Sequence, residues 1–486
     1  MAKSLTKNSF FYLIYNVLNV IFPFITGIYV ARILLPSDIG QIETARNLAQ
    51  YFVIFSFLGL PTYGLREISK ARHCSNELNI LYSELMIINT ISTILFLLIY
   101  LMIIFTIPMY RCNIVVFLIT GISIALNFMN NTWLFEGLEK FDYISIRNII
   151  FKFISLMLLF YFVKDSSDYL SYALITVVGT AGNYILNMIN SKNYVKFTIE
   201  NINLKRHVKS ILYLALVNLA IEIYSLVDIT MLGIMCKKEV VTFYSYGMKI
   251  QKIFLQIVNT FTMVLVPRIA YYYNEKKFSD FNYLLTKTLS IILIIAVPII
   301  VGVNFISSPV ITLIYGNNYI RSAKVLKTLI FTVLISPIGY LLGSRVLLVT
   351  SNEKKMIVAV SYGAICNLIG NFILIPMYQE NGAAIASVFS EFIVASVYII
   401  ISKKYFNLFK HQLINTIYKI LLASSVIFLF LLLSRRYLDY TILSIIADII
   451  FSVLLYFGIL LITKETILYE FYKKMLGGNC KWLKKN

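Results

Sequence analysis

Six basic residues lie within or at the edges of long apolar stretches: Arg46, Lys152, Lys249, Lys252, Arg345 and Lys419. A charge in such surroundings is costly unless it faces protein or water, so each residue is a candidate for function. An ammonium or guanidinium group there can replace the water that a phosphate loses on leaving the aqueous phase. For Lys152 and Arg345 the alternative is a side chain that extends to the membrane surface, and for Lys419 this is the favoured interpretation.

Residues 241–267 carry polar side chains at three- and four-residue steps, which places them on one face of a helix. They are Thr242, Ser245, Lys249, Lys252, Gln256 and Asn259. The preceding apolar stretch carries Glu222 and Asp228. Counted from the turn between the two stretches, Glu222 lies at the depth of Lys252, and Asp228 lies near the depth of Lys249. Opposite charges can therefore pair between consecutive antiparallel helices, either to couple transport to an ion or as a purely structural ion pair.

The N-terminal part of the chain repeats this theme. A polar face runs along residues 8–31 and includes Asn16 and Asn19, and the next stretch carries Glu43 and Arg46. Arg46 lies as far from the outer end of its stretch as Lys249 does from its own. The two halves of the chain are therefore expected to present similar polar faces.

The elements that must position these residues are membrane helices. Of the 486 residues, 59% are hydrophobic and only 14% are charged, and the mean hydropathy is +0.80. So little charge cannot cover a soluble globular surface of this size. At roughly 20 apolar residues for each crossing, the chain has room for about 14 transmembrane helices, which makes it an all-α polytopic membrane protein. The apolar runs are 8–31, 40–62, 82–106, 112–134, 144–163, 168–190, 210–235, 241–267, 283–307, 323–349, 356–376, 383–402, 412–433 and 441–463.

Charge and a weak internal similarity suggest the organisation of these spans. Most lysines and arginines fall on segments that are cytoplasmic if both termini are inside, as the positive-inside rule requires. A shift of 201 residues places VARILLPSDIG near MLGIMCKKEVV, which indicates two related halves. The predicted domains are six-helix lobes at 1–200 and 205–403, two additional helices at 404–463, and a basic cytoplasmic tail at 464–486 that rests against anionic lipid headgroups.

Several classes of function are disfavoured. The net charge of +20 has no basic soluble module to carry it, so nucleic acid is not an expected partner. The five cysteines and three histidines are scattered, which argues against a metal site or a disulfide framework. No glycine-rich phosphate-binding loop occurs, which argues against ATP hydrolysis, and no aqueous segment is long enough for a nucleotide-sugar site. We therefore expect neither an enzyme nor a bound cofactor.

Four segments resemble bacterial polysaccharide repeat-unit flippases of the O-antigen and capsule type, which belong to the multidrug, oligosaccharidyl-lipid and polysaccharide exporter superfamily. They read YSLVDITMLGIMCKKEVVTFYSYGMKIQKI with VPRIA (224–270), LGLPTYGLREISKAR (58–72), WLFEGLEKFDYISIRNIIFK (133–152) and NLIGNFILIPMYQENGAAIAS (367–387). The resemblance implies two six-helix lobes around a central cavity, in the bacterial plasma membrane. It places Asp228, Lys249 and Arg268 on the family's pattern for spans 7 and 8, and Arg66 at the cytoplasmic end of span 2. Arg345 departs from the family, because relatives often have an uncharged polar residue such as Gln there.

The residues and the resemblance together predict a flippase for a polyprenyl-diphosphate-linked oligosaccharide that works by alternating access. In this hypothesis one set of cations binds the diphosphate: Arg46, Lys249, Lys252, Arg345 and Lys152. The amides of Asn16, Asn19, Gln256 and Asn259 bind the sugar, Glu222 or Asp228 couples transport to a proton or sodium ion, and Arg66 and Arg268 form a cytoplasmic gate. Expected partners are membrane lipids and the saccharide polymerase with its chain-length machinery. The alternatives are a peptidoglycan lipid flippase, a drug exporter of the same superfamily, which would need more acidic residues, and a membrane polymerase, which would need a reactive external loop.

Overall fold

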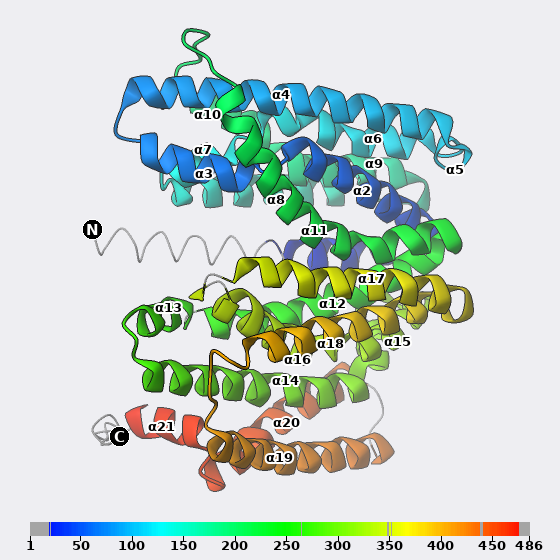
Figure 1. Cartoon of the computed structure of the whole chain (residues 1–486). Coiled ribbons are helices and arrows are strands. Elements are labelled where there is room, and N and C mark those ends of the chain that lie inside the picture. Colours follow the sequence, from blue (N-terminus) through cyan, green and yellow to red (C-terminus); the bar gives the residue numbers. More distant parts are fainter. Residues whose placement is uncertain are drawn as a thin grey trace. The chain divides into compact units, whose positions relative to one another are not determined.

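The computed structural model describes residue 19 and residues 21–263, 265–347, 349–350, 352–437 and 441–475 (Figure 1). Within these ranges it does not describe the side chains of residues 216–224, 263, 266, 267, 344, 353, 354, 437, 474 and 475. Every regular element in these ranges is a helix, as predicted. The chain folds into two compact units, Met1–Ser245 and Tyr246–Asn486. The predicted lobe boundaries were drawn from the number of membrane spans, whereas these units are defined by packing contacts. The predicted boundaries therefore stay a prediction.

The first unit begins with a helix over Ile21–Ala31. The elements that follow are α2 (Pro36–Phe57), α3 (Leu60–Ala71), α4 (Ser75–Thr106), α5 (Pro108–Arg111), α6 (Ile114–Ala125), α7 (Thr132–Gly137), α8 (Phe141–Phe162), α9 (Tyr169–Ala181), α10 (Asn183–Ser191) and α11 (Lys205–Met235). Short 3₁₀ turns lie at Leu126–Met129 and Ser166–Asp168. The helix α12 (Lys238–Met263) starts in this unit and continues into the second.

The second unit contains α13 (Val266–Asn274), α14 (Phe278–Tyr315), α15 (Arg321–Leu329), α16 (Thr332–Tyr340), α17 (Glu353–Tyr378), α18 (Glu380–Ser402), α19 (Lys410–Tyr437), α20 (Ile442–Ile462) and α21 (Thr466–Met475). A 3₁₀ turn at Asn317–Tyr319 precedes α15, and a π-helical segment, η4 (Leu341–Leu347), extends α16. Residues of α19 and α20 pack on α14 in one buried apolar cluster that includes Ile294, Ile427 and Leu460. The two additional helices are thus anchored to the second unit through α14.

Eleven helices in the described ranges are long and apolar enough to cross a membrane, and each coincides with a predicted span. The three other predicted spans fall on Ile21–Ala31, α11 and α12. Charged and amide side chains such as Lys249, Lys252 and Gln256 make α12 less apolar than its neighbours. The chain is therefore a multi-pass membrane protein.

The predicted second span is interrupted where α2 gives way to α3. Leu58 has a positive φ of 49°, and Pro61 lies in the first turn of α3. A Cβ atom on Gly59 would lie 2.5 Å from the carbonyl oxygen of Ile211 on α11. Glycine is needed here because it lets the backbone of α11 approach the break closely. The resulting junction orients α3 against α4, α7 and α11, whose buried side chains form one cluster that includes Trp133.

Candidate functional site

Arg46 lies on a partly exposed face of α2. Its Nη1 atom lies 3.3 Å from Oε2 of Glu43, one turn earlier; the Arg46 side chain is 37% exposed and that of Glu43 is 10% exposed. The next residue, Asn47, is buried and donates to Oγ1 of Thr230 on α11 at 2.7 Å. Thr230 in turn donates to the hydroxyl of Tyr51 at 3.0 Å. This Asn47–Thr230–Tyr51 network, which the sequence analysis did not identify, fixes α2 against α11 and thereby orients Arg46.

Asp228 is buried on α11, and its Oδ2 atom accepts a hydrogen bond from the hydroxyl of Tyr244 on α12. A buried carboxylate needs such a donor, because an unsatisfied charge would be strongly destabilising. The predicted pairing by depth matched Asp228 with Lys249, five residues after Tyr244, and that pairing stays a prediction. Tyr244 was not predicted as a site residue, because its type also suits simple aromatic packing.

Two predicted cations of the second unit lie over tyrosine rings. The Nζ atom of Lys249 is 4.4 Å from the ring centroid of Tyr246. The guanidinium of Arg345, in η4, is 4.5 Å from the ring centroid of Tyr340 and donates to its hydroxyl at 3.0 Å. The Tyr246 ring is itself held by Tyr315, whose centroid lies 4.5 Å away in an edge-on contact. Cation–π contacts of this kind stabilise a charge by about 0.5–2 kcal/mol without neutralising it.

The structure brings Lys152 and Asn19 together. The Nζ atom of Lys152 on α8 donates to Oδ1 of Asn19 at 2.5 Å, and it lies 5.6 Å from the centroid of the Phe22 ring. Both residues were predicted site residues, one for the diphosphate and one for sugar. Because the amide oxygen of Asn19 already accepts a hydrogen bond from Lys152, these two side chains act together and not as separate binding groups. Their roles in binding stay predictions.

The remaining predicted residues are placed as follows. Gln256 is partly buried, Lys252 is exposed, and the Oδ1 atom of Asn259 is buried with no described donor. Arg66 is exposed, donates to Oε1 of Glu67 at 2.8 Å and lies over the Tyr63 ring, whereas Arg268 is exposed on α13. Asn16 and the side chain of Glu222 lie outside the described residues. Among the residues that are described, no group of three or more His, Cys, Asp or Glu side chains could hold a metal ion.

Sequence reasoning missed a buried charged cluster around Glu84 on α4. The Glu84 side chain is fully buried, and its Oε2 atom accepts from Nη2 of Arg206 and lies 2.8 Å from Nε2 of His207. Its Oε1 atom accepts from the backbone N–H of Asn203 at 2.6 Å, and the other ring nitrogen of His207 lies 2.7 Å from the Tyr63 hydroxyl. The signal was available, because Glu84 is an acid inside the predicted span 82–106. We call this group the Glu84 cluster.

Comparisons with known proteins agree with this architecture. A family model described as "Polysaccharide biosynthesis protein" matches residues 5–273, and a second, described as "MatE", matches residues 214–373. A "Putative O-antigen transporter" of Shigella dysenteriae is 25% identical over 393 residues, covering 77% of this chain and 94% of the relative. A protein of Escherichia coli (strain K12) with the same description is 21% identical over 418 residues, covering 81% of this chain and 95% of the relative.

A solved structure has the same fold. The inward closed conformation of the lipid II flippase MurJ superposes with a TM-score of 0.74 at 16% identity, covering 96% of this chain and 99% of that chain. That match extends over most of α19 and α20, so the two additional helices belong to the shared fold. The first family model spans more than half of the chain, and the relatives are described as transporters. The chain therefore belongs to the polysaccharide biosynthesis protein family, as a membrane transporter of the multidrug, oligosaccharidyl-lipid and polysaccharide exporter superfamily and not as an enzyme.

Proposed function

We propose that this protein is a flippase that moves a polyprenyl-diphosphate-linked oligosaccharide from the cytoplasmic to the outer leaflet of the bacterial plasma membrane. The description of two relatives as O-antigen transporters supports a saccharide cargo. A diphosphate and a set of sugar hydroxyls cannot cross hydrocarbon unaided, because both would lose their water without replacement. The protein must supply that replacement inside the membrane.

The observation that carries the proposal is the way in which the intramembrane cations are held. Lys249 and Arg345 rest on tyrosine rings, and the Arg46 side chain is more exposed than that of its neighbour Glu43. A cation over a ring keeps its full charge and can still donate to an anion. These three residues can therefore form charge-assisted hydrogen bonds to a diphosphate. A drug exporter for cations would need the opposite charge at these positions.

Amide side chains on α12 can bind the sugar. The buried Oδ1 atom of Asn259 has no described donor, and a saccharide hydroxyl would satisfy it. Gln256 lies one turn away on the same helix and offers both donors and an acceptor. The polyprenyl chain would stay in the lipid throughout, so that only the polar headgroup needs protein contacts.

Alternating access needs a driving force, and Asp228 is the described candidate for coupling to a proton or sodium ion. Its carboxylate is buried on α11 and accepts a hydrogen bond from the Tyr244 hydroxyl. Protonation or sodium binding there would change this hydrogen bond, and with it the packing of α11 on α12. Transport by Asp228→Asn that responds to an imposed ion gradient as the intact protein does would remove this step.

The test is transbilayer movement of a polyprenyl-diphosphate oligosaccharide in proteoliposomes. We expect Arg46→Ala and Lys249→Ala each to slow movement by about 10- to 100-fold, because each loses a charged hydrogen bond of about 1.5–3 kcal/mol. Arg111→Ala, which removes an exposed cation at the end of α5, is the matched control and should leave movement unchanged. Equal rates in all three variants would refute the role of these cations.

The cargo is tested in the same vesicles. Replacing the oligosaccharide by lipid II examines the peptidoglycan alternative, because the diphosphate is retained and only the headgroup changes. Preferential movement of lipid II would reassign the cargo. Absence of movement with every diphosphate-linked headgroup, by folded protein, would overturn the flippase proposal.

A further inference from the structure

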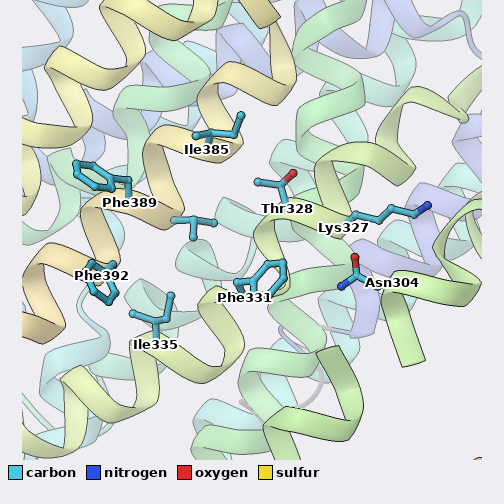
Figure 2. A pocket seen from close by; sticks show the side chains of 9 residues that line it. Asn304, Lys327, Thr328, Phe331, Ile335, Ile385, Phe389 and Phe392 are labelled. Atoms are coloured by element: carbon cyan, nitrogen blue, oxygen red, sulfur yellow. The ribbon is translucent and has the colours of Figure 1, made fainter. Parts of the chain in front are cut away.

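An apolar groove of about 500 Å³ lies on the second unit, between α14, α15–α16 and α18 (Figure 2). Its apolar part is lined by Phe331, Ile335, Ile385, Phe389 and Phe392. Val388 on α18 and three polar side chains complete the lining: Lys327 and Thr328 on α15, and Asn304 on α14. Figure 2 shows Lys327 and Asn304 on one side of the groove, opposite Phe389 and Phe392.

The groove is separate from the candidate transport residues. The α15–α16 segment packs on α12 through Val325, close to Gly247, and through Thr332, which accepts from Nε2 of Gln251 at 2.6 Å. The groove uses a different face of the same segment. Phe331, Phe389 and Phe392 are 45%, 57% and 56% exposed, so the groove is open along its aromatic wall.

The groove spans about one leaflet. Arg321, the first residue of α15, forms two hydrogen bonds with the carboxylate of Glu380, the first residue of α18, so the two helices start at the same level. At about 1.5 Å for each residue, Lys327 lies about 9 Å below that level and Phe392 about 18 Å below it. In a hydrocarbon core of about 30 Å, the groove therefore runs from near the surface to the bilayer centre.

Charge selects the headgroup that would sit at the upper end. No described residue forms an ion pair or hydrogen bond with the ammonium group of Lys327. Lys324 lies one turn closer to the surface and is exposed. These two cations attract an anionic phosphate and repel the quaternary ammonium of a zwitterionic headgroup.

We propose that this groove is a binding site for an anionic phospholipid, with its phosphate at Lys327 and one acyl chain along Phe331, Phe389 and Phe392. The length of the groove, about one leaflet, favours an acyl chain over a polyprenyl chain, because a long polyprenyl chain exceeds a single leaflet. With both termini cytoplasmic, the site faces the outer leaflet. It is independent of the transported cargo, and its failure would leave the proposed function untouched.

Fluorescence quenching tests this site in vesicles of the full-length protein. Phe389→Trp places a reporter in the groove, and Phe451→Trp on α20 is the matched control. Both phenylalanines lie nine residues from the first residue of their helix and are similarly exposed, at 57% and 54%. The vesicles are phosphatidylcholine with about one lipid in five replaced by phosphatidylglycerol, and either lipid carries bromine on its acyl chains. Quenching of the unsubstituted protein is subtracted, since the chain has two tryptophans.

We expect brominated phosphatidylglycerol to quench the tryptophan at position 389 several-fold more than its share of the bilayer predicts. Lys327→Gln should abolish this excess, whereas Lys164→Gln, which removes an exposed cation of the first unit, should preserve it. Quenching at position 451 should follow bulk composition in every case. Equal quenching by both brominated lipids at position 389, or an excess that survives Lys327→Gln, overturns the proposal. Relief of quenching by undecaprenyl diphosphate at lower amounts than by unlabelled phosphatidylglycerol also overturns it, in favour of the cargo lipid.

Discussion

The Glu84 cluster holds the linker between α10 and α11 against α4, and Glu84→Gln should release that linker. The carboxylate binds the linker backbone at Asn203 and the first residues of α11 at Arg206 and His207. Nearer the start of α4, Oδ1 of Asn79 accepts from the backbone N–H of Lys196 at 2.7 Å. The linker is therefore attached to α4 along its length, and the buried carboxylate is its only charged attachment among the contacts described for residues 196–204.

The expected cost follows from the burial of each partner. Removing one member of a buried ion pair costs about 3–5 kcal/mol, because the other member is left without compensation. Arg206 is 48% exposed and can recover water, whereas the His207 side chain is 4% exposed and cannot. We therefore expect Glu84→Gln to destabilise the closed linker by about 3 kcal/mol, the lower end of that range. At about 1.4 kcal/mol for each factor of ten, the opened linker should become on the order of 100-fold more populated.

Limited digestion with trypsin measures this opening, because Lys192 and Lys196 are exposed at the start of the linker. Cleavage there should accelerate up to on the order of 100-fold in Glu84→Gln when opening is fast relative to cleavage. Glu77→Gln, an exposed acid on the first turn of the same helix, is the control and should behave like the unmodified protein. Tyr63→Phe removes only the hydroxyl next to His207 and should have a smaller effect, about 1 kcal/mol. Equal cleavage rates in Glu84→Gln and Glu77→Gln would show that the cluster does not hold the linker.

Two further predictions concern stability in detergent, measured as the Tm of the purified protein. Gly40→Ala should lower Tm and reduce the free energy of unfolding by about 1–3 kcal/mol, because the added Cβ would lie 1.8 Å from the carbonyl oxygen of Lys238. Gly302→Ala is the control: a Cβ there would have no atom within 4 Å, so Tm should stay unchanged or rise slightly. A lower Tm in both would mean that the close approach at Gly40 is not the cause. Arg321→Lys should also lower Tm, because lysine cannot make both hydrogen bonds to the buried Glu380 carboxylate, and the free energy of unfolding should fall by about 1–2 kcal/mol. Arg72→Lys is the control and should change Tm little, because its partner Glu139 is 53% exposed. Equal Tm shifts in the two variants would contradict the distinction between a buried and an exposed partner.

Hydropathy predicted the membrane-embedded part of most helices but not where the helices end. The third span was predicted at 82–106, and α4 begins seven residues earlier, at Ser75. The extra two turns carry Asn76, Glu77 and Asn79, which reach the aqueous boundary or the linker, so no apolar signal marks them. The break at Leu58–Gly59 was likewise invisible to hydropathy, because it depends on the close approach of α11.

The candidate site shows what spacing along one helix can and cannot determine. Counting residues gives the depth of Asp228 and of the α12 cations, because the rise per residue is constant. Counting does not determine which of several side chains at similar depths pair, and it did not predict the hydrogen bond between the Tyr244 hydroxyl and Asp228. Glu84 could be recognised as an acid inside a predicted span, but its partners could not be predicted, since the cluster joins α3, α4 and the linker, whose contact is set by tertiary packing.

A repeated contact supports the prediction of two related lobes. On α4, Asn79 and Ser83 accept from the backbone N–H groups of Lys196 and Thr198. On α14, Asn282 and Thr286 accept in the same way from Asn407 and Phe409. In each case residues four apart on a helix bind N–H groups two apart on an extended segment, and the two helix pairs are separated by 203 residues, close to the predicted shift of 201.

The next position in each helix carries a charged side chain, of opposite sign in the two halves. Glu84 follows Ser83 and binds Arg206, whereas Lys287 follows Thr286 and lies 3.2 Å from Oε2 of Glu470 on α21. An ion pair tolerates such a reversal because its energy depends on opposite signs and not on which side carries which. The segment after the sixth span is thus tied to the third, and the segment after the twelfth to the ninth. A six-span segment that is hydrogen-bonded in this way to the chain that leaves it occurs twice, which is the repetition expected of two related halves.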